Sequence, residues 1–187
     1  ARSRAVLAAG AAPLLERLLG DSLDTHEAAA GAFRSITAAV SDDECAEMAL
    51  ARGGALPRAL VALLRGSPDA QEQAAGALRN LAAPEDERAA SAVAAAGAVV
   101  QLVAAIGRGT PNCRAASAAA VGNLANANAE LASLVAGAGA VGPLADLLVL
   151  EPPLGTAEGR DAAAFALRAL AESSRSCAEA VLAGGAV

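Results

Sequence analysis

An alanine-rich segment recurs four times along the chain at nearly constant intervals, and this periodicity restricts the possible folds more than any other feature of the sequence. The clearest copy is Ala74-Ala75-Gly76-Ala77-Leu78-Arg79-Asn80-Leu81-Ala82. Its counterparts are residues 29–37, 117–125 and 163–171. With Asn80 as the index position, the matching residues lie 43 to 46 residues apart and are Ser35, Asn123 and Ala169. A period of this size is typical of a solenoid, in which one structural unit stacks on the next.

The composition favours helices as the repeating elements. Of the 187 residues, 55% are hydrophobic but only 1% are aromatic, so the interior must be built from Ala, Leu and Val. Ala has the highest helix propensity, and its short side chain lets helices pack closely. The sequence therefore predicts an all-α solenoid over residues 1–187, with repeats at about 5–48, 49–92, 93–134 and 135–180 and the start of a fifth at 181–187. Because the array begins and stops abruptly, we expect it to be a piece of a longer protein.

Two regularly spaced landmarks divide each repeat into helices. A glycine recurs every 42 to 46 residues, at Gly10, Gly54, Gly97, Gly139 and Gly185. Glycine suits a turn between two short helices because it adopts positive φ at little cost. Good N-cap residues stand eleven positions before the last four glycines, at Asp43, Asp86, Asn128 and Ser174. We expect a first helix of two to three turns between each cap and its glycine, and a second helix at 13–19, 57–64, 99–106 and 143–148.

A longer third helix is predicted to complete each repeat. Another N-cap residue stands thirteen positions before the index position, at Ser22, Ser67, Thr110 and Thr156. At 100° per residue, Leu78 and Leu81 fall on one side of this helix, whereas Gln73, Gly76 and Asn80 cluster on the other. The leucine side is expected to be core and the other side open. Stacking would align the open sides of the third helices into one continuous surface, which is the expected functional surface.

The chain resembles armadillo repeats, as found in the beta-catenin and importin-alpha families. The resemblance rests on three helices per unit, the Gly-Ala turn and above all the segment from Gly76 to Ala82, and it covers about residues 5–187. A two-helix HEAT repeat would leave the central glycine unexplained. The resemblance implies a right-handed superhelix whose concave groove, lined by the third helices, binds extended peptides.

The resemblance also implies which residues would bind such a peptide. In the family, a ladder of asparagines bonds to the peptide backbone; Asn80 and Asn123 match it, whereas Ser35 and Ala169 do not. An amide suits this role because it can donate to a carbonyl and accept from an N–H. The predicted peptide-binding residues are Asn80, Asn123, Gly76, Gln73, Ser35 and Phe165, and the small residues expected to leave room for the partner are Gly76, Ala77, Ala119 and Ala120. The opposing interpretation is that the two asparagines only join neighbouring repeats.

Charged residues seven positions apart lie along one edge of the predicted third helix. The pairs are Glu27 with Arg34, Glu72 with Arg79, and Asp161 with Arg168. Because two helical turns separate the members of a pair, contact between an arginine and an acidic residue of the next repeat is an equal alternative. These groove-edge charges are interpreted either as solvated side chains, since exposed ion pairs contribute little to stability, or as a means of steering a charged partner.

Nucleic-acid binding, catalysis and metal binding lack the residues that they need. All 14 basic residues are Arg and the net charge is −6, which argues against a nucleic-acid partner. Cys45, Cys113 and Cys177 form no CxxC pair, and His26 is the only histidine, so neither a metal site nor an enzyme is expected.

Cofactor binding and membrane insertion are not expected either. Residues 137–142 match the dinucleotide fingerprint G-x-G-x-x-G, but no βαβ pattern surrounds them. Residues 89–107 are uncharged and nominally long enough to span a bilayer, but Gly97 and Gln101 interrupt the apolar run. We therefore predict no cofactor and no direct insertion into a membrane, while the oligomeric state stays open.

The predicted function is that of a protein-protein interaction scaffold with a protein or peptide partner. Importin-alpha-like proteins carry a Trp four residues before each asparagine, whereas this chain has Gly31, Gly76, Ala119 and Phe165 there. Weak or no binding to basic nuclear-signal peptides is therefore expected. The alternatives are the substrate-recruiting armadillo domain of a ubiquitin ligase and a nuclear-import adaptor. The expected location is the cytoplasm, the nucleus or both.

Overall fold

The chain folds into successive sets of helices, each set consisting of two short helices and a long one. The structure is a computed structural model that describes Arg17 and residues 23–83 and 87–184. Within these residues all regular structure is helical, which confirms the predicted all-α solenoid. The predicted landmarks Gly10, Ser22, Asp86 and Gly185 lie outside the described residues, as does the helix predicted at 13–19 apart from Arg17.

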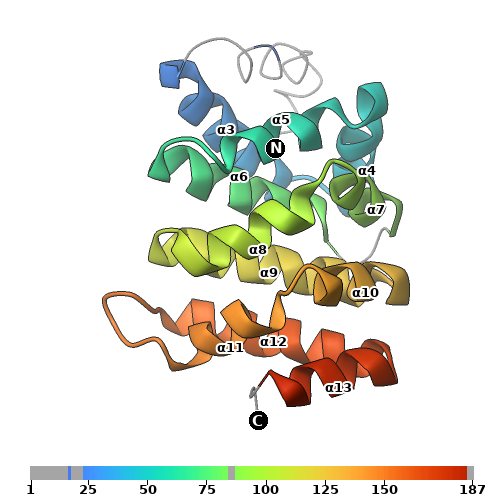
Figure 1. The fold of residues 1–187 in the computed structure, drawn as a ribbon. Helices are drawn as coiled ribbons and strands as arrows, with labels where there is room; N and C mark the ends of the chain where they lie inside the picture. The colour runs from blue at the N-terminus through green and yellow to red at the C-terminus, as the bar shows by residue number, and fades with distance from the viewer. Residues whose placement is uncertain (1–16, 18–22, 84–86, 185–187) are drawn as a thin grey trace.

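The sets of helices stack one above another from the N-terminal to the C-terminal end (Figure 1). The helices are α3 (Leu23–Thr37); α4 (Asp42–Leu50), a 3-10 turn (Ala51–Gly53), α5 (Ala55–Leu63) and α6 (Pro68–Leu81); α7 (Glu87–Ala95), α8 (Ala98–Arg108) and α9 (Pro111–Ala127); α10 (Ala129–Gly137), α11 (Val141–Val149) and α12 (Ala157–Ser173); and α13 (Arg175–Ala183). The repeat boundaries predicted after residues 48, 92, 134 and 180 fall inside α4, α7, α10 and α13. Units drawn on whole helices therefore begin several residues earlier than predicted.

Side-chain caps begin the helices at the predicted places, with one exception. The predicted caps accept a bond from the backbone N–H three residues on, and they are Ser67, Thr110, Asn128, Thr156 and Ser174. The exception is α4: the prediction of Asp43 as its cap is wrong, because Ser41 is the N-cap and Asp43 lies in the first turn. Ser41 and Glu44 form a capping box, in which the Glu44 carboxylate accepts from the Ser41 backbone N–H at 2.9 Å. This reciprocal pair satisfies two backbone donors, whereas a lone Asp cap would satisfy one.

The turn between the first and second helices depends on the predicted glycine. Gly54, Gly97 and Gly139 have φ angles of 79°, 82° and 77°, in the left-handed region that favours glycine. The chain bends by 78° between α7 and α8 and again between α10 and α11. No described helix is by itself long and apolar enough to cross a membrane, although each of these two bent pairs meets the length and composition criteria when taken together.

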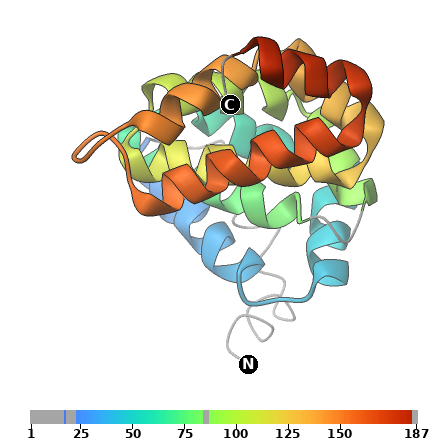
Figure 2. The same cartoon turned by 90° about the horizontal axis from the view of Figure 1, so that it is seen from below.

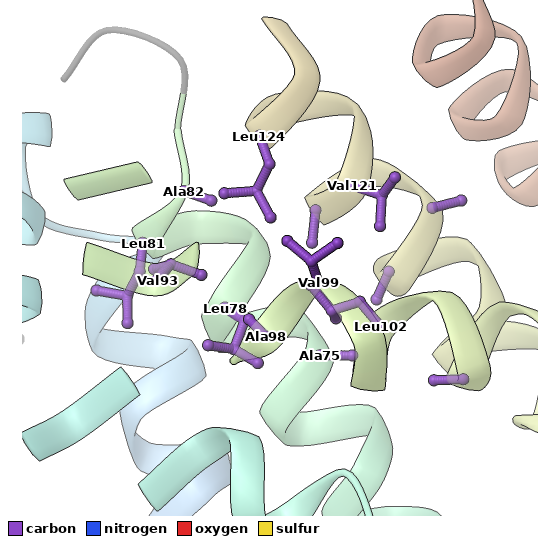
Figure 3. Packing of buried hydrophobic residues seen from close by; sticks show 14 of the residues in the cluster. Ala75, Leu78, Leu81, Ala82, Val93, Ala98, Val99, Leu102, Val121 and Leu124 are labelled. Atoms are coloured by element: carbon purple, nitrogen blue, oxygen red, sulfur yellow. The ribbon is translucent and has the colours of Figure 1, made fainter. Parts of the chain in front are cut away.

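The long third helices α3, α6, α9 and α12 pack side by side in sequence order, and each second helix packs against the third helix that follows it. Figure 2 views the stack from its C-terminal end, where α12 and α13 form the outermost layer. Ala, Leu and Val fill the space between layers: Leu78 and Leu81 of α6, Val99 and Leu102 of α8 and Leu124 of α9 belong to one buried cluster (Figure 3). Burial of one such leucine stabilises the fold by about 1.5–3 kcal/mol. The leucine side of the third helix is therefore core, as predicted.

Candidate functional site

Successive third helices bring polar side chains of different repeats together on one surface, here called the third-helix face, which consists of α3, α6, α9 and α12. A hollow of about 360 Å³, here called the central hollow, lies on this face and takes its lining from all four helices and from the cap of α12. Its lining residues are Arg34, Glu72, Arg79, Asn112, Ala115, Ala116, Ala119, Thr156, Glu158 and Ala162. A second hollow of about 540 Å³, the N-terminal hollow, is lined by Glu27, Ala28, Gly31, Ser35 and Gln73.

The two asparagines predicted to bind a peptide backbone take equivalent places on α6 and α9, and both bond to the preceding third helix. Asn123 Nδ2 donates to the Arg79 carbonyl at 3.0 Å. Asn80 Nδ2 donates to the Arg34 carbonyl at 3.3 Å and to Thr37 Oγ1 at 3.1 Å. Both side chains are half-buried. The asparagines therefore join neighbouring repeats, whatever else they bind.

Asn80 and Asn123 differ in the hydrogen-bonding groups that stay available. Asn80 Oδ1 accepts from Arg79 Nε at 3.3 Å and from Arg79 Nη2 at 3.2 Å, so its donors and its acceptor are all engaged. Within the described ranges, the Asn123 side chain bonds only to the Arg79 carbonyl. Asn123 therefore keeps one N–H and its Oδ1 for another molecule, whereas Asn80 has a free acceptor only after Arg79 releases it.

The predicted exposure of Gly76 is wrong. Gly76 is buried because the Arg34 side chain lies across it: a Cβ placed on Gly76 would stand 2.7 Å from Arg34 Nε and 2.8 Å from Arg34 Cδ. Ala77 and Ala120, expected to leave room for a partner, are fully buried as well, and of the small residues named for this role only Ala119 lines the central hollow. The angular projection treated one helix alone and could not include a long side chain from the neighbouring repeat. A role for Gly76 in peptide binding stays a prediction.

The other predicted peptide-binding residues lie on three of the four third helices, Ser35 on α3, Gln73 on α6 and Phe165 on α12. Gln73 accepts from Arg34 Nη1 at 3.2 Å and lines the N-terminal hollow together with the exposed Ser35. Phe165 is half-buried on α12, and its ring packs on Gly122 of α9, where a Cβ would stand 2.5 Å from Phe165 Cδ1. Gln73 thus lies on the same helix as Asn80, and Phe165 packs on the residue that precedes Asn123; a role of these residues in peptide binding stays a prediction.

One of the charges spaced seven residues apart contacts an acidic residue of the next repeat. Arg34 Nη1 lies 3.9 Å from Glu72 Oε1 of the next repeat, which is the alternative arrangement considered for these charges. Glu72 also accepts from Thr110 Oγ1 at 3.3 Å and from Asn112 Nδ2 at 3.2 Å. In the described part of the chain, none of the three predicted pairs forms an ion pair. Of their remaining members, Glu27, Asp161 and Arg168 are exposed, and Arg168 lies 3.7 Å from Glu172 and above the Phe165 ring.

Arg79 is a half-buried cation that forms no ion pair in the described residues, although Glu72 and Glu158 line the same hollow. In the described residues its guanidinium donates to the neutral Asn80 amide and to nothing else. Burial lowers the pKa of Arg79, and the positive charge of Arg34 lowers it further. No ion pair with a carboxylate offsets these two effects in the described residues.

Three polar residues that line the central hollow, Asn112, Thr156 and Glu158, were missing from the predicted site. All three lie at the N-terminal ends of third helices, Asn112 at the start of α9 and the other two at the start of α12. Thr156 was recognised only as a helix cap. The spacing of these residues in the sequence does not indicate the hollow, because the helix ends come together around it only when the repeats stack.

The described residues hold no group of three or more potential metal ligands, and the three cysteines are buried and free. Burial raises the pKa of Cys45 to about 11, with a further contribution from Asp42 and Glu44. Burial also raises the pKa of Cys113, whereas hydrogen bonding with the Ser174 side chain lowers that of Cys177.

Comparisons with known proteins agree with this architecture. A family model described as "Armadillo/beta-catenin-like repeat" matches residues 55–83. No curated protein sequence matches the chain. Among solved structures, a computationally designed armadillo repeat protein for modular peptide recognition has a TM-score of 0.88 and 27% identity, covering 99% of this chain and 75% of that one. A second designed armadillo repeat protein has a TM-score of 0.87 and 26% identity, with coverage of 98% and 74%. A third, solved in complex with the peptide (KR)4, has a TM-score of 0.86 and 25% identity, again with coverage of 98% and 74%.

Proposed function

Because this chain belongs to the armadillo-repeat family, we propose that it is a scaffold that binds an extended peptide or partner segment along the third-helix face. Armadillo repeats are a binding scaffold and not a type of enzyme. The designed proteins of the same fold support the proposal, since one was made for modular peptide recognition and another holds a peptide. The observation that carries the proposal is the equivalent placement of Asn80 and Asn123 on consecutive third helices, with donor and acceptor groups of Asn123 left free.

The spacing of the two asparagines suits an extended chain. Packed helices lie roughly 8–10 Å apart, and an extended peptide rises about 3.3 Å per residue. Asn80 and Asn123 would therefore contact peptide backbone groups about two to three residues apart. In this proposal Asn123 donates to one peptide carbonyl and accepts from one N–H, and Asn80 joins when Arg79 releases its Oδ1. The site is short because Ser35 and Ala169 replace asparagine in the outer repeats.

Selection from a displayed library of random twelve-residue peptides tests this proposal. An enriched peptide is then synthesised with a fluorescent label, and its affinity is measured by fluorescence anisotropy. Asn123→Ala should weaken binding about tenfold, because two hydrogen bonds of about 1 kcal/mol each are lost in part. Asn80→Ala should weaken it less, because that amide must first give up its bonds to Arg79.

The control is Asn126→Ala, which removes an exposed amide from α9 that lines neither hollow. Its affinity should equal that of the unmodified protein, and far-UV circular dichroism should show the same helicity for all variants. The proposal is wrong if no peptide is enriched, or if both Asn80→Ala and Asn123→Ala keep full affinity while folded.

A further inference from the structure

The central hollow contains a guanidinium, that of Arg79, which forms no ion pair within the described residues. We propose that this hollow is a carboxylate subsite, in which Arg79, with Arg34 beside it, binds an Asp or Glu side chain of the extended partner segment. The inference rests on the proposed function, because the acidic side chain belongs to the same bound segment. The sequence alone does not indicate the charge of the partner, because positive and negative side chains alternate along this surface. The subsite assigns a preference for an acidic side chain.

The hydrogen bonds of Arg79 leave it able to bind a carboxylate. A guanidinium carries five N–H donors in a planar fork. Nε and Nη2 of Arg79 both donate to Asn80 Oδ1, which is a neutral acceptor, and Nη1 has no acceptor in the part of the chain that the structure describes. A carboxylate accepts two parallel bonds from such a fork, and these charge-assisted bonds are about twice as strong as bonds between neutral groups. Arg79 is therefore placed to exchange a weak acceptor for a strong one.

The charges that line the hollow are not paired with Arg79. Arg34 and Arg79 come from successive repeats and line the same hollow, so their positive charges reinforce each other. Of the two carboxylates in the lining, Glu72 lies 3.9 Å from Arg34 and also accepts from Thr110 and Asn112, and Glu158 is exposed to solvent. Neither forms an ion pair with Arg79 in the described residues. Burial and the neighbouring Arg34 already lower the pKa of Arg79. An incoming carboxylate would relieve both effects.

The fold itself holds Arg34 in position beside the hollow. Gly76 lacks a side chain, which lets the stem of Arg34 cross α6, and Gln73 Oε1 accepts from Arg34 Nη1 at 3.2 Å. Ala115 and Ala119 line the hollow on α9 and leave its volume of about 360 Å³ open for a short side chain. The second guanidinium therefore stays beside the hollow before any partner binds.

The hollow favours a carboxylate over a phosphate. Glu72 and Glu158 also line it and offset much of the attraction of the two arginines, for a carboxylate and for a phosphate alike. The cost of removing an ion from water rises more steeply with its charge than this attraction does, so a phosphate with close to two negative charges is disfavoured relative to a singly charged carboxylate. Binding of a carboxylate to Arg79 would also free Asn80 Oδ1 to accept from the peptide backbone, which couples the acidic side chain to the asparagine.

The library selection of random twelve-residue peptides tests the subsite when it is run on the unmodified protein and on two variants. The unmodified protein should enrich peptides with Asp or Glu at one position, and Arg79→Gln should lose this preference. The matched control is Arg168→Gln, because Arg168 takes the equivalent place in the fourth repeat but is exposed and already paired with Glu172. Arg168→Gln should keep the acidic preference.

Synthetic peptides then measure the size of the effect by fluorescence anisotropy. Replacing the enriched Glu of the peptide by Gln should weaken binding roughly tenfold in the unmodified protein and leave it unchanged in Arg79→Gln. Arg79→Lys, which keeps the charge, should retain part of the preference. Glu158→Gln should strengthen binding of the acidic peptide, because it removes an exposed carboxylate from the lining of the hollow. Far-UV circular dichroism confirms the fold of each variant.

The possible results separate failure of the subsite from failure of the proposed function. Enriched peptides that need Asn123 but show no acidic preference would overturn the subsite and leave the proposed function standing. The subsite is also wrong if the peptide (KR)4 binds more tightly than the acidic peptide, or if a phosphoserine peptide binds more tightly than its Glu counterpart. If no peptide is enriched at all, the proposed function fails and the subsite fails with it.

Discussion

Replacing Gly122 by alanine tests the contact between Phe165 and α9, which joins the third and fourth long helices. Gly122 lies in the interior of α9, where alanine gains about 1 kcal/mol of helix propensity over glycine. Against this gain, the new Cβ would stand 2.5 Å from Phe165 Cδ1, 2.7 Å from Phe165 Cε1 and 3.2 Å from the Cα of Ala166. Overpacking of this kind costs about 1–3 kcal/mol, because a ring and a helix backbone must both shift. The expected net result is a destabilisation of about 1 kcal/mol.

Gly107→Ala is the matched control for this substitution. Gly107 lies in α8, and a Cβ placed there meets no heavy atom within 4 Å. The same chemical change should therefore stabilise the protein by up to about 1 kcal/mol, somewhat less than in a helix centre because α8 ends at the next residue. Urea denaturation followed by far-UV circular dichroism measures both free energies of unfolding, and equal slopes against urea make them comparable.

The reasoning is refuted if Gly122→Ala is as stable as Gly107→Ala. A double-mutant cycle sharpens the comparison, because Phe165→Ala removes the ring that the new methyl group would meet. In the Phe165→Ala background, Gly122→Ala should turn from destabilising to nearly neutral or stabilising. Simple additivity of the two substitutions would show that the ring and the glycine are not in contact.

Two further predictions concern local interactions. Asn128→Ala removes the N-cap of α10 and should lower the free energy of unfolding, measured in urea, by about 1 kcal/mol. The control is Asn126→Ala, which removes an exposed amide and should leave the stability unchanged. An equal loss of stability in the two variants would contradict the capping role of Asn128. The Cys45 thiol has a pKa of about 11 in the folded state against 9.0 ordinarily, so the unfolded thiol ionises first. Its contribution to stability is therefore complete below about pH 9 and is lost as the pH rises through 11. Cys45→Ala should be less stable than the unmodified protein near neutral pH, but its free energy of unfolding should fall less between about pH 9 and pH 11. Urea unfolding at several pH values measures this difference. An equal fall in the two proteins would refute the raised pKa of Cys45.

The order and type of the helices could be predicted because their signals are local. Ser67 and Thr110 cap the helices that follow them, and Gly97 and Gly139 adopt positive φ between short helices, through bonds and backbone preferences that involve only adjacent residues. The misplaced cap of α4 has the same origin. The Ser41 and Glu44 pair was readable in the sequence, but the strict eleven-residue spacing from the glycine favoured Asp43 instead.

The candidate site was predicted only in outline. Periodicity placed Asn80 and Asn123 on consecutive third helices, and the structure finds them in equivalent hydrogen bonds to the preceding repeat. The surroundings of Arg79 did not follow from the sequence, because the side chains that line its hollow come from helices roughly forty residues apart. Whether these side chains come together depends on how far each layer is shifted and rotated against the next. A projection of a single helix gives no information on this.

The sequence by itself determined the repeat, its three helices and the side of each long helix that is core, since backbone propensities, caps and burial of leucine act within one unit or at a fixed period. Only the tertiary structure decided which polar groups on the other side are free. Arg34 covers Gly76, Arg79 occupies the acceptor of Asn80, and Asn123 keeps a donor and an acceptor. The physical reason is that long side chains reach across the boundary between repeats, so the availability of each group is set by its neighbour in the stack.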